Sequence, residues 1–215
     1  MKLPKRRLLL PLTLGVLFVV LFDSPLVYPF RLFVVFLHEV SHGIAAVATG
    51  GAIVSIAISP DEGGVCLTRG GWPFVILNAG YLGSLLFGAL FLLLGGKRRF
   101  AASVVGTIGV FTLLAALLYV RSWFGFVYCL VMGLALIIVS LWLPAGVSEV
   151  VLAAIGAMSM LYAVADIASD AIFRHAAASD AAVLARATGL PTVLWGALWI
   201  AASLATLVAV ARRLA

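Results

Sequence analysis

The sequence predicts an all-α membrane protein with six or seven transmembrane helices and a small β-hairpin next to the helix that carries a candidate active site. Of the 215 residues, 65% are hydrophobic and only 10% are charged, which lies far outside the range of soluble proteins. Runs of about 20 apolar residues, the length that a bilayer core about 30 Å thick requires, follow one another along the chain. We therefore expect one integral membrane domain over residues 1–215.

The first apolar run extends from Leu8 to Phe22 and follows a basic start, as in a signal peptide. No small-x-small cleavage site comes after it. Asp23, Ser24 and Pro25 instead indicate a helix end and a turn. We expect this segment to be an uncleaved first membrane helix.

A second apolar segment runs from about Phe30 to Ala48 and ends at two glycines. The pattern then changes to residues typical of strands in Ala52 to Ile58, a turn through residues 60–64, and a second strand in Val65 to Thr68. This pattern predicts a β-hairpin. A hairpin offers an unpaired strand edge, where a locally extended peptide could add as a further strand.

Apolar helical segments separated by Pro, Gly or charged residues follow the hairpin. They are expected at about Pro73 to Leu94, Phe100 to Val120, Phe124 to Leu143, Val147 to Phe173, a short helix from Ser179, and Thr192 to Ala211.

Positive charge is concentrated at helix ends, with fourteen Lys and Arg against eight Asp and Glu. Such clusters orient a chain against the cytoplasmic leaflet. If all three segments before Lys97 cross the bilayer, the cluster at 97–99 opposes the N-terminal cluster, so either one early segment is re-entrant or the rule is overridden. The charges form no stripe interleaved with aromatics, which argues against nucleic-acid binding. Two cysteines without metal spacing imply no disulfide framework.

The strongest functional signal is the sequence His38-Glu39-Val40-Ser41-His42 within the second apolar segment. Residues four apart on a helix point the same way, so both imidazoles can bind one zinc ion while Glu39 faces a water bound there. Zinc lowers the pKa of such a water towards about 7, and a carboxylate beside it can take the proton. Ionisable groups at membrane depth are costly and are usually kept for function. The sequence therefore predicts one zinc per chain, with His38 and His42 as ligands and Glu39 as general base and acid.

A HExxHG sequence in a membrane helix resembles the site-2 protease family of intramembrane zinc metallopeptidases, especially its compact branch without a PDZ domain. Asn78-Ala79-Gly80-Tyr81-Leu82-Gly83-Ser84 is similar to that family's Gly-x-x-x-(Asn/Ser/Gly) element, here Gly80 and Ser84. The polar run from Tyr162 to Asp180, including Ser179-Asp180-Ala181, also looks like the compact branch. The resemblance implies that Asn78, Gly80 and Ser84 contribute to substrate binding.

The third zinc ligand has to be inferred, because the Leu-Asp-Gly and Asn-Pro-x-x-Asp-Gly sequences that commonly supply it in the family are missing. Asp23, Asp61 and Asp180 lie in expected turns or at a helix start, where acidic residues serve as caps. His175 falls near the interface. Asp166 and Asp170 remain on one helical face; Asp170 has Arg174 as a natural partner, so Asp166 is the prediction and Asp170 the alternative.

The function expected from the motif and the resemblance is hydrolysis of peptide bonds in membrane-anchored proteins. The partners would be that substrate and the lipid bilayer, with no nucleic acid, in a multi-pass protein of a bacterial cell membrane. The alternatives are a non-catalytic membrane protein, either a metal carrier or a pseudoprotease scaffold, and a metal-dependent membrane hydrolase acting on lipid or another small substrate.

Overall fold

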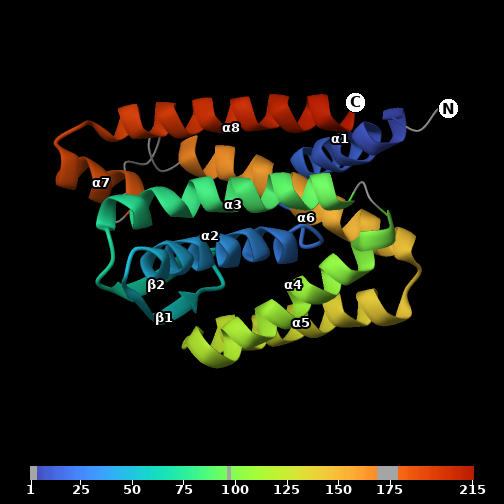
Figure 1. The fold of residues 1–215 in the computed structure, drawn as a ribbon, viewed down its shortest axis with the longest axis horizontal. Coiled ribbons are helices and arrows are strands. Elements are labelled where there is room, and N and C mark those ends of the chain that lie inside the picture. Colours follow the sequence, from blue (N-terminus) through green and yellow to red (C-terminus); the bar gives the residue numbers. More distant parts are fainter. Residues whose placement is uncertain (1–3, 96–97, 169–178) are drawn as a thin grey trace.

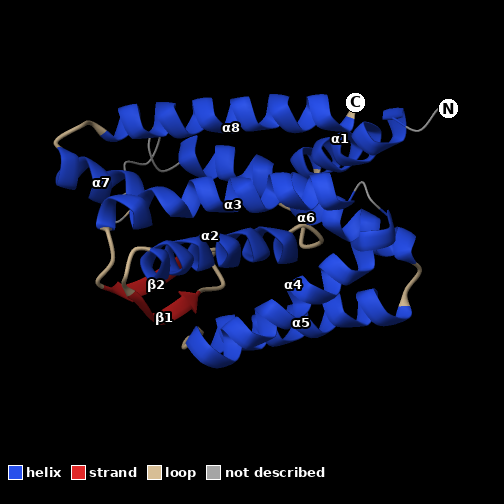
Figure 2. Ribbon diagram, in the orientation of Figure 1, coloured by secondary structure: helices blue, strands red, loops and turns tan. Residues whose placement is uncertain are grey.

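The computed structural model describes residues 4–95, 98–168 and 179–215. It contains long helices, one short helix and a two-stranded antiparallel hairpin, which confirms the predicted fold class (Figures 1 and 2). In chain order the elements are α1 (Pro4–Val20), α2 (Tyr28–Ala48), β1 (Ala52–Ile58), β2 (Gly64–Arg69), α3 (Pro73–Gly95), α4 (Arg98–Tyr119), α5 (Trp123–Trp142), α6 (Ala145–Ala168), α7 (Asp180–Thr188) and α8 (Thr192–Leu214).

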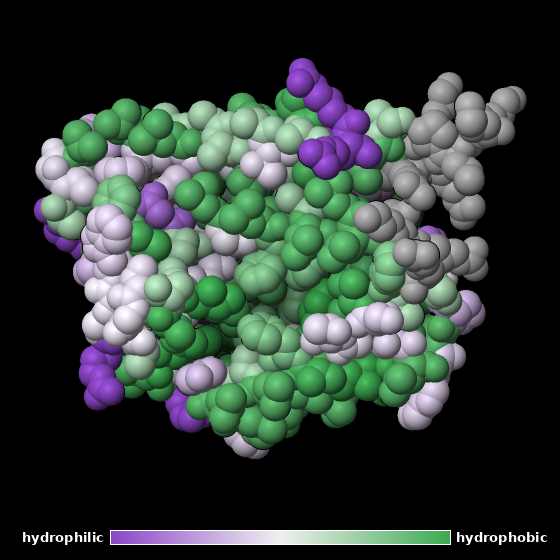
Figure 3. Space-filling model, viewed as in Figure 1, coloured by the Kyte–Doolittle hydropathy of each residue, from purple (hydrophilic) through white to green (hydrophobic). Residues whose placement is uncertain are grey.

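Six of the described helices, α2 to α6 and α8, are long and apolar enough to cross a membrane. The apolar part of α1, Leu8–Val20, is shorter. Whether α1 also crosses the membrane therefore decides between six and seven transmembrane helices. Hydrophobic side chains cover most of the face in Figure 3, along α3, α4 and α5. Their exposure is expected where lipid rather than water is the solvent.

The central helix of the molecule is α2, in which 78% of the apolar window is buried, against 22% in α5. In Figure 1 it lies between α3 on one side and the α4–α5 pair on the other, with the hairpin against its C-terminal half. In the N-terminal half of α2, Phe33 and Phe36 are fully buried. Most side chains of α2 are therefore packed against other parts of the protein.

Small residues let α3 approach its neighbours closely. A Cβ on Gly88 of α3 would lie 2.9 Å from the Gly156 carbonyl oxygen of α6, and a Cβ on Gly156 would lie 2.9 Å from the Gly88 carbonyl oxygen. Neither position has room for a larger residue without a shift of backbone. Such pairs of small residues are how membrane helices gain close van der Waals contact.

The outer edge of β1 is covered by the α4–α5 connection. Ile56 forms an isolated bridge with Val120, and its carbonyl oxygen accepts a hydrogen bond from the Arg121 amide at 2.9 Å. The Ser122 hydroxyl closes the end of the same edge against Ile58. In the described ranges no strand pairs with the other edge of β2. Of the two strands, β2 is therefore the one whose outer edge pairs with no described strand, although the Cys66 amide on that edge donates to Glu39.

Candidate metal centre

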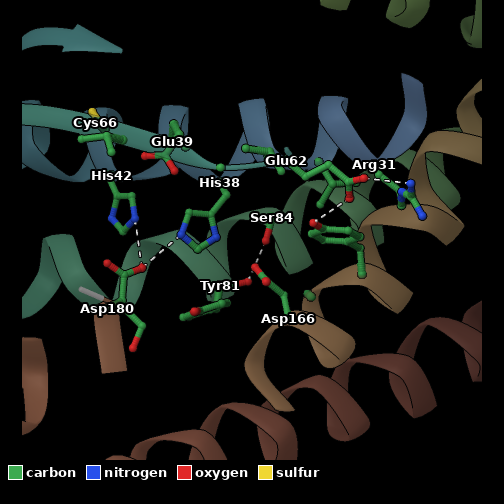
Figure 4. Close-up of a pocket in the computed structure, with 18 of the residues that line it drawn as sticks. Arg31, His38, Glu39, His42, Glu62, Cys66, Tyr81, Ser84, Asp166 and Asp180 are labelled. Atoms are coloured by element: carbon green, nitrogen blue, oxygen red, sulfur yellow. Dashed lines mark hydrogen bonds and ion pairs between the residues drawn. The ribbon is translucent and has the colours of Figure 1, made fainter. Parts of the chain in front are cut away.

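The two histidines of the motif lie on one face of α2, as the four-residue spacing predicts, with ring centroids 4.8 Å apart. Both Nε2 atoms point to the same carboxylate oxygen, Oδ2 of Asp180, at 3.0 Å from His38 and 3.1 Å from His42 (Figure 4). All three side chains are largely buried. Helix α2 thus directs two nitrogen donors, and α7 one oxygen donor, to one point.

The environment of His42 determines which of its nitrogens carries the proton. Its Nδ1 lies 2.7 Å from the Ile76 carbonyl oxygen of α3, and a carbonyl can only accept, so Nδ1 carries the hydrogen and donates. In the neutral ring Nε2 is then an acceptor that faces the Asp180 carboxylate, another acceptor. Two facing acceptors need a cation between them, either a proton or a metal ion.

The donor set fits zinc. Two ligand atoms at about 2.0–2.1 Å from a tetrahedral zinc ion lie roughly 3.3 Å apart, close to the two separations seen here. Two imidazoles and one carboxylate are also a ligand set of catalytic zinc sites, which leave the fourth position open. Among the described residues, His38, His42 and Asp180 form a group able to hold a metal ion.

The backbone of α3 passes close to both imidazoles at Gly80. A Cβ on this residue would lie 2.6 Å from the Cε1 atoms of both His38 and His42. Tyr81 follows and packs edge-on against the His38 ring. Gly80 therefore keeps the space around the Nε2 atoms open, and Tyr81 fixes the orientation of one ring.

The carboxylate of Glu39 faces the hairpin. It is buried, it accepts a hydrogen bond from the Cys66 backbone, and a Cβ on Gly64 would lie 2.8 Å from its Cδ. Strand β2 therefore covers the acidic group that lies between the two histidines in sequence. Burial, together with the nearby Glu39 carboxylate, raises the pKa of the Cys66 thiol to about 12.

The predicted approach of Asp166 to the two histidines is not found, and Asp180 lies there instead. Asp166 lines the same cavity, which has a volume of about 900 Å³, but its carboxylate points towards Ser84 and Tyr81 of α3 (Figure 4). Both α6 and α7 pack against α3, but it is the first residue of α7, Asp180, that reaches the two histidines where they contact Gly80. Asp170 and His175, the other candidates, lie outside the described residues.

From the sequence, Asp180 is expected to act as a helix cap, as acidic residues at a helix start usually do. Here the cap is Ser179, whose hydroxyl accepts a hydrogen bond from the Ala182 amide at 3.3 Å. The Asp180 carboxylate is therefore free to turn inward. Burial opposes its ionisation, but the two imidazoles directed at it outweigh that effect and hold its pKa well below the usual value. The serine directly before Asp180 is the feature of the sequence that could have indicated that Asp180 is not the cap.

The three residues expected to bind substrate have different surroundings. The backbone of Gly80 packs against the two histidines. The buried Ser84 lines the cavity and donates a hydrogen bond to the Tyr81 carbonyl oxygen. Asn78 accepts a hydrogen bond from the Trp199 indole of α8 at 2.8 Å and donates to the Phe74 carbonyl oxygen. Its amide thus joins α3 to α8.

A comparison with protein families decides what kind of protein carries this site. The family model described as Peptidase M50B-like matches residues 12–210, nearly the whole chain. The chain belongs to the site-2 protease family. As a member of that family with six apolar helices, it is a multi-pass integral membrane protein of a protease class. Comparisons with curated proteins and with solved structures gave no significant match.

Proposed function

We propose that this site-2 protease family member is a zinc-dependent endopeptidase that cleaves membrane-anchored proteins within or beside the bilayer. The observation that carries the proposal is the meeting of His38, His42 and Asp180 at one point, with the carboxylate of Glu39 beside it. Zinc held there would act as a Lewis acid that polarises the scissile carbonyl and makes water a stronger nucleophile near neutral pH.

In this mechanism Glu39 moves the proton. Its carboxylate accepts a proton from the attacking water and then gives it to the leaving amine, as general base and then general acid. The Cys66 backbone and the close approach of Gly64 keep this carboxylate oriented and shielded from bulk water. His42, held by the Ile76 carbonyl, keeps its Nε2 lone pair directed at the metal position.

The outer edge of β2, which pairs with no described strand, is the proposed place for the substrate. A peptide bond inside a helix is hydrogen-bonded and shielded, so the substrate has to be extended locally before its carbonyl can react. Gly64, Cys66 and Thr68 of β2 line the cavity that contains Glu39 and the histidines. A substrate strand that adds to this edge would present its backbone to the site.

The distribution of charge favours an enzyme over a metal carrier. A carrier needs a file of polar residues across several spans. Here six of the eight acidic residues of the chain line the one cavity: Asp23, Glu39, Asp61, Glu62, Asp166 and Asp180. Most of the described acidic groups thus converge on one cavity.

The test is a proteomic comparison of membranes that carry either the wild-type protein or the Glu39→Gln variant. Gln keeps the volume and loses the proton acceptor, so cleavage should fall by on the order of 10²-fold or more. Membrane-anchored proteins should then accumulate uncut in the variant, while zinc stays bound. Equal cleavage by both proteins would refute the proposed proteolytic mechanism and favour a pseudoprotease scaffold.

A further inference from the structure

The turn between the two strands is fixed by side chains from two helices. Glu62 in this turn forms an ion pair with Arg31 of α2, with Nη2 and Oε1 2.8 Å apart. The hydroxyl of Tyr162 on α6 donates to its other carboxylate oxygen at 3.2 Å. We call these three side chains the Glu62 clamp. It joins the hairpin to two membrane helices that are distant in sequence.

Two members of the clamp, Arg31 and Glu62, are in energetically unfavourable positions. Arg31 is buried in an apolar helix, where a charge without a partner is strongly unfavourable. Its guanidinium also donates to the Phe22 carbonyl oxygen and lies over the Phe22 ring. Glu62 has a positive φ of 65°, which non-glycine residues rarely adopt. A buried cation and a disfavoured backbone conformation are thus both maintained by this contact.

Two residues of β2, Gly64 and Cys66, connect the clamp to the proposed catalytic base, Glu39. Gly64 follows Glu62 by two positions, and its Cα lies so close to Glu39 that a Cβ would meet the carboxylate. Cys66, two residues further on, supplies the backbone hydrogen bond to Glu39. Any outward movement of the turn would therefore withdraw the backbone that covers this group.

We propose that Glu62 is a positioning residue, whose contacts with Arg31 and Tyr162 hold strand β2 against the carboxylate of Glu39. This inference rests on the proposed function, because the group positioned is the proposed base. The clamp acts through the hairpin and touches neither the metal position nor the scissile bond. Its loss should open the hairpin and lower turnover while leaving the three metal-binding side chains in place.

The chain contains its own reporter of this movement. It has two cysteines; Cys129 is fully buried in α5, and Cys66 lies in β2 beside Glu39. In a Cys129→Ala background, Cys66 is the single thiol. Because burial holds its pKa at about 12, it should react slowly with a maleimide while β2 is in place and faster once the strand moves away.

The experiment measures the rate of Cys66 labelling, kcat and zinc content in four full-length proteins in the Cys129→Ala background. They are the parent, Glu62→Gln, Tyr162→Phe and the control Asp23→Asn. Asp23 is also near Arg31, at 3.9 Å, but its side chain is fully exposed. Tyr162→Phe removes one hydroxyl and keeps the ring stacked on Phe22, so it is the milder variant.

We expect Glu62→Gln and Tyr162→Phe to raise the labelling rate and lower kcat, each by about tenfold for the loss of a hydrogen bond to a charged group. Zinc content should not change, and Asp23→Asn should be labelled at the rate of the parent. Unchanged labelling in both clamp variants would overturn the inference, as would faster labelling with unaltered kcat. Labelling needs no activity, so an inactive parent would refute the proposed function while the labelling rates still decide whether the clamp holds β2.

Discussion

The surroundings of single residues determine what the site can do. His42 is held through Nδ1 by the backbone carbonyl of Ile76, so the acceptor does not depend on which side chain residue 76 carries. Asp180 is able to face the histidines because its neighbour Ser179 serves as the helix cap. Gly80 provides space that no other residue would leave. The chemistry therefore depends as much on these neighbours as on the motif.

Gly80→Ala should disable the metal centre. The added methyl group would lie within 2.6 Å of carbon atoms of both imidazoles, so either the rings or α3 must move, at a cost of about 1–3 kcal/mol. We expect zinc affinity to fall at least tenfold, as measured by titration against a chelator. Gly146→Ala is the matched control, because a Cβ there meets no atom within 4 Å. Equal zinc affinity in the two variants would contradict the role of Gly80.

The residues that the sequence could identify are those whose relation is local. His38, Glu39 and His42 are one helical turn apart, so helix geometry alone brings them together. Asp180 is 142 positions from His38, and its placement depends on the path between α6 and α7. No periodic pattern in the sequence predicts that Asp180 lies next to His38. The pairing of Arg31 with Glu62 was missed for the same reason, although a lone Arg in an apolar span is itself a sign of a buried partner.

At the scale of elements, the long apolar segments were predictable because membrane thickness fixes their length. The first hairpin strand was expected at Ala52 to Ile58 and is found there, and α2 begins two residues earlier than predicted. Which strand edge stays open was not predictable, since the α4–α5 connection that covers β1 at Ile56 is a tertiary contact.

Thr68→Pro tests whether β2 binds the substrate. Strand residues alternate in the direction of their N–H groups, and Cys66 directs its N–H away from β1, so Thr68 should do the same. Proline removes this donor without breaking the β1–β2 ladder. We expect kcat/KM to fall about fivefold, the value of one hydrogen bond, with zinc retained. Thr68→Val keeps the N–H and should behave as wild type. Indistinguishable kinetics of the two variants would exclude this edge as the substrate site.

At the scale of the whole molecule, the fold places a polar cavity inside an apolar envelope. Six of the eight acidic residues line that cavity, and Arg31 is its one basic lining residue in the described part of the chain, whereas the last turn of α8 carries Arg212 and Arg213. Charges are costly in the bilayer, so this arrangement has to be maintained by function. Helices α2, α3, α6 and α7 all contribute to the cavity.

The measurement that tests this account most directly is the zinc content of the purified protein and of two aspartate variants. We predict one zinc per chain in the wild type and in Asp166→Ala, and loss of zinc in Asp180→Ala, because Asp180 completes the site with His38 and His42. Both variants remove one carboxylate from the same cavity, so each controls for the other. Retention of zinc by Asp180→Ala together with its loss from Asp166→Ala would contradict the account.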